Sequence, residues 1–381
     1  MKKSVYRLSA LLLFVILMAG CGRENLPITD SAGTIKIGVF QPLTGAHAAG
    51  GELELKGIRL ANKLYPEVLG KKIELIEGDN KSDRVEAVHV ASSLVNNRVS
   101  AVLGSWGSTM SIAGGPVFAN AKIPVIAASA TNPKVTLGNK YYYRVCFIDS
   151  FQGTVMANYT YDELAKTKVG ILREINSEYS VDLANFFAQQ YKERGGTIVA
   201  TYDFKKDEQD FKSILTQLKS SGAEVIFAPS SYTEASHIIN QARDMGIELD
   251  ILGGDTWENP ELINQGGSAI EGIIFSTFFD KDHSLTNETN KFMEAWEIEY
   301  PNEEVAAASI LAYDAYLMAY KAMESAGSAN PGKIQEALNK VEDFQGAAGV
   351  VNFDENRNAI KGVVIKQVKN GAFTFLDVVE P

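Results

Sequence analysis

Residues 99–133 read VSAVLGSWGSTMSIAGGPVFANAKIPVIAASATNP, and their pattern is the most informative about the fold. A short apolar run, 99–103, is followed by a helical pattern that begins near Ser108, and a second apolar run ends near Ser129. This order predicts a strand, a helix and a second parallel strand. Because parallel strands end at the same edge of a sheet, the loop with Ser108 and the loop with Ser129 and Thr131 should lie close together.

Both loops have the composition of a binding site for a small anion. Backbone N–H groups at the start of a helix, with the hydroxyls of Ser108 and Thr109 beside them, suit a carboxylate. The stretch contains no nucleophile that is accompanied by a general base. It therefore indicates a site that holds a ligand rather than one that transforms it.

The rest of the chain repeats the alternation of strands and helices. Strands are expected at 35–40, 72–77, 141–147, 168–172, 197–204, 224–228, 250–252 and 273–278, with three short ones after 350. Helices are expected at 51–65, 82–96 with Ser82 as its cap, 149–165, 179–194, 207–220, up to 245, 287–300, 303–326 and 333–341. Two similar series, 35–147 and 168–278, predict an α/β protein with two lobes of one kind, each with a parallel sheet.

Length and charge narrow the function further. The chain has 381 residues, of which 45% are hydrophobic and 22% charged, so two lobes are expected rather than one core. The net charge is −11, and it becomes −14 (−11 minus 3) without Lys2, Lys3 and Arg7. Such an acidic chain repels phosphate backbones, which argues against a nucleic-acid partner.

Residues 1–21 have the architecture of a secretory signal. A positive start precedes an apolar run, 8–18, that is too short to span a membrane comfortably, and Ala19 and Gly20 stand before Cys21. This ending resembles the bacterial lipoprotein box, which implies cleavage before Cys21, lipidation of its thiol, and a polar tether at 22–33. The alternative is a plain secreted protein with an incidental cysteine. The other cysteine, Cys146, is expected to be a small core residue, and no internal disulfide is available.

Several chemistries lack their usual sequence motifs. The four histidines are far apart, none lies in a metal-binding spacing, and structural or solvent-exposed roles are expected for them. The sequence contains neither GxGxxG nor GxxxxGK[ST] nor GxSxG, which argues against dinucleotide, triphosphate and hydrolase sites. No metal and no cofactor is therefore expected.

Four aromatic residues fall in or beside loops at the carboxyl ends of predicted strands: Trp106, Tyr179, Tyr232 and Trp257. An aromatic ring in such a loop can form a wall against a ligand, or it can pack in the interface between the lobes. Both interpretations stay open at this point.

The chain as a whole resembles the branched-chain amino acid (Leu/Ile/Val) binding proteins, the type I periplasmic binding proteins of ABC importers. The resemblance covers residues 35–376, and its markers occur in the family's order: IKIGVFQPLTG (35–45), GKKIELIEGDN (70–80), AVLGSWGSTMS (101–111), KIPVIAASATNP (122–133), YYYRVCFIDSFQG (141–153), QARDMGIELDILGGD (241–255) and LAYDAY (311–316). It implies two doubly wound, Rossmann-like lobes joined by a three-stranded hinge, with limits 34–149 plus 279–351 and 150–278 plus 352–381.

The resemblance also implies roles for individual residues. Ser108 falls on the serine that binds the ligand's carboxylate, and Ser129 and Thr131 fall on the pair that meets the carboxylate and the amine. Asp255 falls on the acidic partner of the ammonium group, contributed by the other lobe. The alternative for Asp255 is that it caps a short helix near Asn259.

The pocket for the ligand's side chain departs from the family. Gly50 and Ala308 stand where the family has aromatic residues, and Ser231 stands at a further tyrosine position, one residue before Tyr232. Trp106 and Trp257 are candidates to refill the space. Leu, Ile and Val are therefore not expected to be the tightest ligands, and a bulkier or more polar amino acid should bind at least as well.

The resulting hypothesis is a monomeric receptor, lipid-anchored to the bacterial cell membrane or held in the periplasm. It would capture a small amino acid or analogue and deliver it to the membrane subunits of an ABC permease. Two other functions remain open. The same module could be a sensor that presents its closed form to a receptor, or the chain could be an α/β enzyme.

Overall fold

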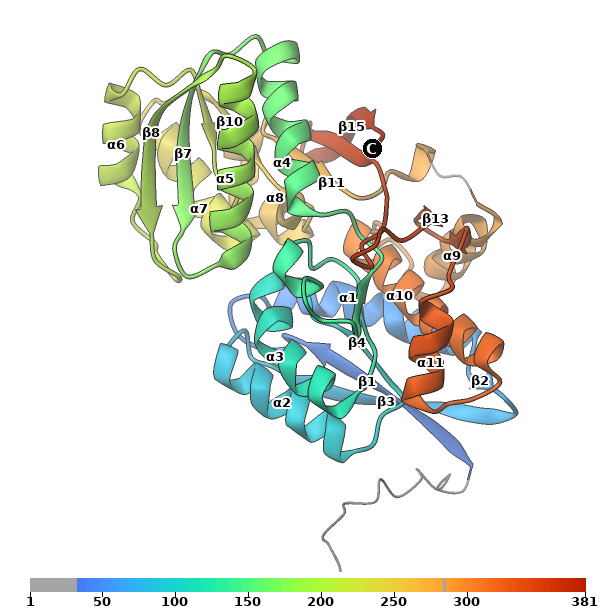
Figure 1. The fold of residues 1–381 in the computed structure, drawn as a ribbon. Helices are drawn as coiled ribbons and strands as arrows, with labels where there is room; N and C mark the ends of the chain where they lie inside the picture. Colours follow the sequence, from blue (N-terminus) through green and yellow to red (C-terminus); the bar gives the residue numbers. More distant parts are fainter. Residues whose placement is uncertain (1–32, 284–285) are drawn as a thin grey trace, which may run out of the picture. The chain divides into compact units, whose positions relative to one another are not determined.

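The structure is a computed structural model that describes residues 33–283 and 286–381. The predicted signal segment and Cys21 lie outside the described residues. Residues 33–381 form one compact unit that contains two large sheets with helices on both faces (Figure 1). No helix in this described part is both long and apolar enough to pass through a lipid bilayer.

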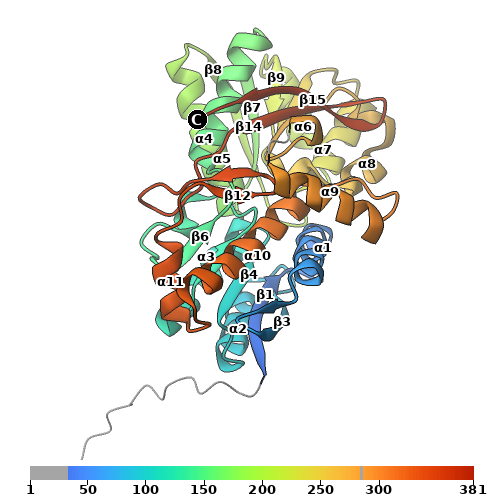
Figure 2. The same ribbon diagram turned by 90° about the vertical axis from the view of Figure 1, so that its right-hand side faces the viewer.

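The first sheet is built from the N-terminal part of the chain, in the order β2-β3-β1-β4-β5-β6. Its strands are β1 (Thr34–Gln41), β2 (Glu67–Val68), β3 (Lys71–Asp79), β4 (Ala101–Gly104), β5 (Val125–Ala127) and β6 (Tyr142–Arg144). All neighbours are parallel except β2 and β3. Helices α1 (Ala48–Leu64) and α10 (Ala307–Ala326) cover one face, and α2 (Arg84–Asn96) and α3 (Ser108–Ala121) cover the other (Figure 2).

The second sheet has the order β15-β14-β11-β10-β9-β7-β8. Its strands are β7 (Lys168–Glu174), β8 (Thr197–Phe204), β9 (Val225–Phe227), β10 (Asp250–Gly253), β11 (Ile274–Thr277), β14 (Val363–Lys369) and β15 (Ala372–Val379). The last two run antiparallel and the others are parallel. The helices of this part are α4 (Asp149–Asn158), α5 (Glu178–Glu193), α6 (Lys212–Ser220), α7 (Tyr232–Asp244) and α8 (Pro260–Gly266).

The chain passes between the two sheets three times, after β6, after β11 and after β13. The remaining elements lie between the last two passages: α9 (Asn287–Glu299), α11 (Pro331–Leu338), β12 (Phe344–Gly346) and β13 (Gly349–Val351). Helices α9 and α10 pack against α1, so this segment belongs with the first sheet. The predicted fold class, two doubly wound lobes, is confirmed. The residue limits given above for the lobes stay a prediction.

Strand β4 shows why both faces of these sheets are covered. Ala101 and Leu103 pack in the apolar cluster under α1 and α10, whereas Val102 between them packs in the cluster under α2 and α3. All of them are fully buried. A continuous apolar strand of this kind requires a helix layer on each side of the sheet.

Several predicted element boundaries are wrong, for local reasons. Asp83, not Ser82, caps α2, because its carboxylate accepts the N–H groups of Val85 and Glu86 while Ser82 has a left-handed backbone (φ 57°). Helix α6 begins at Lys212 rather than at 207, since Asp207 also has a positive φ of 62°. Helix α4 was expected to run to 165 but ends at Asn158, where a π-helical turn, Tyr159–Glu163, follows. The strand expected at 141–147 is only β6, Tyr142–Arg144.

Candidate ligand site between the two sheets

A cavity of about 520 Å³ lies among the loops at the carboxyl ends of the two sheets. Loops after β1, β3, β4 and β5 line it from the first lobe, and loops after β7, β8, β9 and β10 line it from the second. In each sheet the cavity lies where the order of the strands reverses, between β1 and β4 in the first sheet and between β7 and β9 in the second. Doubly wound sheets bind their ligands at this topological switch point. The volume falls in the range of small-molecule pockets, about 300–1,000 Å³.

The structure brings most of the predicted site residues to this cavity. The six that line it are Trp106, Ser108, Ser129, Thr131, Tyr179 and Asp255. Tyr232 and Trp257 are not among the lining residues.

The two excluded aromatic residues support the walls from behind. Trp257 is 0% exposed, its ring lies against Gly253, and its Nε1–H donates to the carbonyl of Ser230 (3.2 Å). Tyr232 packs edge-on against Trp106, with ring centroids 6.4 Å apart. The expectation that Trp257 forms a wall against the ligand is therefore corrected: it is a core residue.

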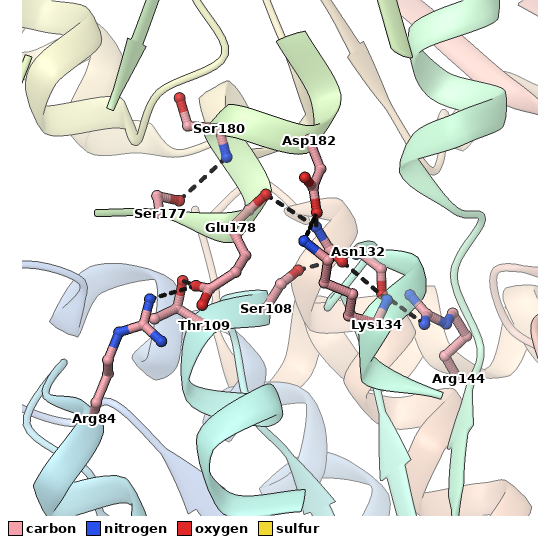
Figure 3. A network of polar contacts seen from close by, with 10 residues as sticks. All are labelled: Arg84, Ser108, Thr109, Asn132, Lys134, Arg144, Ser177, Glu178, Ser180 and Asp182. Atoms are coloured by element: carbon pink, nitrogen blue, oxygen red, sulfur yellow. Dashed lines mark hydrogen bonds and ion pairs between the residues drawn. The ribbon is translucent and has the colours of Figure 1, made fainter. Parts of the chain in front are cut away.

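Ser108, at the start of α3, lines the cavity and can donate a hydrogen bond to a ligand there. Its Oγ accepts the backbone N–H of Asn132 (3.0 Å), which leaves its own proton unused (Figure 3). The preceding Gly107 has φ 83°, which lets the chain turn sharply into the helix. A helix start with a free hydroxyl proton suits a carboxylate.

Asp255 is a buried carboxylate at the opposite, second-lobe side of the cavity. Its Oδ1 accepts hydrogen bonds from Nε2 of Gln152 (2.8 Å) and from the hydroxyl of Tyr179 (3.0 Å). Burial nevertheless raises the pKa of Asp255 to about 7, because the desolvation outweighs these hydrogen bonds. The helix-capping alternative is wrong, since Asn259 itself caps α8 by accepting the N–H of Glu261.

A second buried acid, Asp149, lies behind the first-lobe loop that carries Thr131. The Thr131 hydroxyl lies near the carboxylate of Asp149 and lowers its pKa, but within the described residues neither group completes a hydrogen bond. Burial and the negative charge of Asp255 together raise the pKa of Asp149 well above its usual value. A cationic ligand group would relieve this accumulation of buried acids.

Trp106 occupies the space that Gly50 leaves open. A Cβ atom on Gly50 would lie only 2.4 Å from the Trp106 ring, so no side chain fits there while the indole is in place. His47 packs on the other side of the ring, with centroids 5.3 Å apart. One of the two expected tryptophans thus fills the gap in the family's aromatic wall.

A second, polar region of the cavity was not predicted. It is lined by His47, Ser82, Asp83, Arg84, Glu174, Asn176, Ser177, Lys205 and Lys206. Glu174 is only 5% exposed, and its carboxylate has no hydrogen-bond partner in residues 33–283 and 286–381. Burial, and then the charge of Glu234, raise its pKa to about 7. The sequence offered one indication that Glu174 could line the site, which is its position just after the predicted strand 168–172.

The two lobes also touch each other directly beside the cavity (Figure 3). Glu178 of α5 accepts hydrogen bonds from Arg84 (2.6 Å) and Thr109 (2.8 Å). Asp182, one turn later, accepts from Asn132 (2.9 Å) and Lys134 (2.7 Å). These four partners belong to the first lobe. We call the set the interlobe latch.

Buried Arg144 fixes the loop that carries Ser129 and Thr131. Its guanidinium donates to the carbonyls of Ala130 (2.6 Å) and Asn132 (2.8 Å). The loop's geometry therefore depends on a cation that lies outside the cavity.

Residues 34–372 match the family model described as periplasmic binding protein. The chain belongs to this family. A solved leucine-binding protein from Thermotoga maritima is 38% identical, covering 91% of this chain and 99% of that one, with a TM-score of 0.89. A branched-chain amino acid transporter substrate-binding protein from Streptococcus pneumoniae, solved with isoleucine, is 34% identical, covering 91% and 100%, with a TM-score of 0.86.

Among curated proteins, this periplasmic binding protein is 27% identical over 345 residues to the Leu/Ile/Val-binding protein homolog 1 of Brucella suis. The match covers 89% of this chain and 91% of that protein. The predicted family is thereby confirmed, and so is ligand binding rather than catalysis as the class of activity. A periplasmic family also agrees with the predicted extracytoplasmic location.

Proposed function

We propose that the protein is the substrate-binding component of an ABC importer and that it captures an amino acid or a close analogue between its lobes. One observation carries this proposal: the buried carboxylate of Asp255 shares a single cavity with the hydroxyls of Ser108, Ser129 and Thr131. An acid on one lobe and donors at a helix start on the other suit a ligand with both an ammonium and a carboxylate. Solved relatives at 34% and 38% identity are described as binding isoleucine and leucine, which supports an amino acid as ligand.

The ligand's side chain, in this proposal, is more polar than that of Leu, Ile or Val. Trp106 fills the space at Gly50, so the cavity gains little apolar volume there. The cavity instead continues into the region of Glu174, Asn176 and Lys206, where the Glu174 carboxylate, which feels the charges of Lys206 and Arg84, can accept a hydrogen bond. A ligand with an N–H group at its far end would satisfy it.

Capture works through closure of the lobes. A ligand that contacts Ser108 and Asp255 at once stabilises the closed form, because those groups meet around one ligand only when the lobes are together. A ligand that touches one lobe alone would shift nothing. The permease would then recognise the closed form.

A thermal-shift screen of residues 22–381 against all twenty L-amino acids tests the proposal. A ligand at about 100 times its dissociation constant adds roughly 2.7 kcal/mol of stability. We expect a shift with at least one polar amino acid that exceeds the shifts with Leu, Ile and Val. If calorimetry finds one of those three tightest by tenfold, the inferred side-chain class is wrong, and if no amino acid shifts the transition, the proposed function is wrong.

We further propose that Cys21 is lipidated and tethers the protein outside the cytoplasm. The support is the sequence Ala19-Gly20-Cys21 after an apolar signal segment. Changing Cys21 to Ser should move the protein from the membrane fraction to the soluble extracytoplasmic fraction, since the lipid supplies the attachment. A Cys21→Ser variant that still sediments with salt-washed membranes would contradict the anchor.

A further inference from the structure

Glu54 is a buried acid that touches two walls of the cavity without lining it. It lies in α1 and is fully buried. Its Oε1 accepts the hydroxyl of Ser129 (2.5 Å), and its Oε2 accepts the side-chain N–H of Gln41 (2.5 Å). The side-chain oxygen of Gln41 in turn accepts the backbone N–H of Trp106 (2.8 Å). One carboxylate thus supports Ser129 directly and Trp106 through Gln41.

While Glu54 is ionised, the direction of every hydrogen bond in this series, from Ser129 to Trp106, is determined. A backbone N–H can only donate, so the Gln41 oxygen must face Trp106 and the Gln41 NH₂ group must face Glu54. An ionised carboxylate can only accept hydrogen bonds, so the Ser129 hydroxyl must donate its single proton to Glu54. The Ser129 oxygen therefore presents only lone pairs to the cavity.

Ser108 has the opposite polarity. Its oxygen already accepts the N–H of Asn132, and its proton remains free for the ligand. The two serines look alike in the sequence, yet one donates to the ligand and the other accepts from it.

We propose that Glu54 is a positioning residue that makes Ser129 a hydrogen-bond acceptor toward the ligand, so that the group bound at Ser129 must carry an N–H, as an ammonium does. This inference rests on the proposed function, because it takes the cavity to be an amino-acid site. It specifies the ligand's orientation, with its amine toward Ser129 and Asp255 and its carboxylate toward Ser108.

Protonation of Glu54 would reverse the polarity of Ser129. Since Oε2 already accepts from an amide donor, the added proton must sit on Oε1 and point at Ser129, which frees the serine's own proton. Burial raises the pKa of Glu54 to about 7, so the reversal falls within reach of an ordinary pH series. The titratable groups coupled to Glu54 are Tyr142 and Cys146, whose pKa values burial raises, so both stay neutral there. Asp255 titrates in the same range, so a variant of Glu54 is needed to separate the two.

The decisive variant is Glu54→Gln. The amide oxygen must face the Gln41 NH₂ group, which leaves the new NH₂ group facing Ser129 and turns the serine's proton into the cavity. Glu52→Gln is the matched control, since Glu52 lies on the same helix but is exposed. The probes are two pairs that differ only in the amino group: L-leucine with 4-methylpentanoate, and L-glutamine with 4-carbamoylbutanoate, the weaker acids being measured by competition at millimolar concentration.

We expect Glu54→Gln to weaken binding of the amino acid at least tenfold and binding of the amino-free acid less than threefold, with Glu52→Gln changing neither. Ser129→Ala should likewise reduce the difference in affinity between an amino acid and its amino-free acid. This variant replaces Glu54→Gln in the test if Glu54→Gln does not fold. An equal loss for both members of a pair, or an amino acid bound within threefold of wild type, would overturn the inference.

A measurement without ligand keeps the inference separate from the proposed function. Unfolding of Glu54→Gln, Ser129→Ala and the double variant gives the coupling between the two side chains. Additive effects would overturn the inference even if amino acids bind. If wild type binds no amino acid at all, the proposed function is wrong, and the coupling still decides whether Glu54 acts on Ser129.

Discussion

At the scale of single residues, Asp255 makes the most direct prediction. Asn at this position keeps an oxygen for Gln152 and Tyr179 but removes the charge. Truncating one member of a buried charge pair costs about 2–5 kcal/mol, which is roughly 30-fold to several thousandfold in affinity. We expect Asp255→Asn to lose that much affinity for an amino acid in calorimetry, while the free energy of unfolding stays the same or rises.

The matched control is Asp244→Asn, an exposed acid at the end of α7 in the same lobe. It should bind like wild type. If Asp255→Asn stays within threefold of wild type for an amine-bearing ligand, Asp255 does not pair with the ammonium.

At the level of secondary-structure elements, we expect the interlobe latch between α5 and the first lobe to influence how readily the lobes separate. Hydrogen bonds from Arg84 and Thr109 hold the pKa of Glu178 below its usual value, although burial raises it. The pairs are partly exposed, and each contributes only about 0.2–1 kcal/mol. Their number and position, rather than their strength, make them relevant to closure.

We expect the double variant Glu178→Gln, Asp182→Asn to open the ligand-free protein, because its contacts exist only with the lobes together. Small-angle X-ray scattering should show a larger radius of gyration, and ligand affinity should fall about 2- to 20-fold, with less salt dependence than in wild type. Asp162→Asn breaks an ion pair with Arg194 inside one lobe and should change neither. Unchanged scattering and affinity in the double variant would contradict the role of the latch.

Elements with a regular apolar pattern could be predicted from the sequence, and those set by local backbone geometry could not. The strand at 197–204 was predicted with the limits it has, and the helix predicted at 287–300 ends one residue earlier, at Glu299. The start of α6 was not predicted, because the left-handed backbone of Asp207 leaves no trace in the hydrophobic pattern.

The residues of the site likewise fall into those that could be predicted from the sequence and those that could not. Ser108 and Ser129 follow neighbouring strands of one sheet, and parallel strands end at the same edge, so the sequence itself predicted that they meet. That Asp255 of the other lobe faces them was implied only by the family resemblance. The contact of Arg84 with Glu178 joins residues 94 positions apart and depends on how the lobes meet. Glu54 lies in the apolar face of α1, where an acid gives no signal until its partners are known.

At the scale of the whole molecule, buried acids give the protein an unusual dependence of stability on pH. Burial raises the pKa of four carboxyl groups to about 7, compared with ordinary values of 3.8 for Asp and 4.5 for Glu: Glu54, Glu174, Asp255 and Asp314. Between these values the folded state binds more protons than the unfolded state, so the free energy of unfolding should rise as the pH falls from 8 to about 5. His47 opposes this, since burial lowers its pKa to about 4, but it is one group against four.

Urea unfolding at pH 8, 6.5 and 5 measures this effect. Each net proton contributes up to about 1.4 kcal/mol per pH unit. Below about pH 4.5 the gain ends, and acids with lowered pKa values, such as Asp79 and Asp280, reverse the trend as they become protonated. Glu174→Gln should make the free energy of unfolding less dependent on pH, by the contribution of one bound proton. A stability that is flat or falls from pH 8 to pH 5 would contradict the prediction.

The contact between Gly50 and the Trp106 ring restricts how this cavity can change over evolutionary time. Any side chain at 50 collides with the indole, and a smaller residue at 106 leaves a hole beside the ligand. A lineage that moves from an aromatic at position 50 to one at position 106 therefore has to pass through an intermediate that is either overfilled or hollow. The two positions should be inherited as a pair, and a change of ligand preference in such proteins should arrive in coupled steps rather than one substitution at a time.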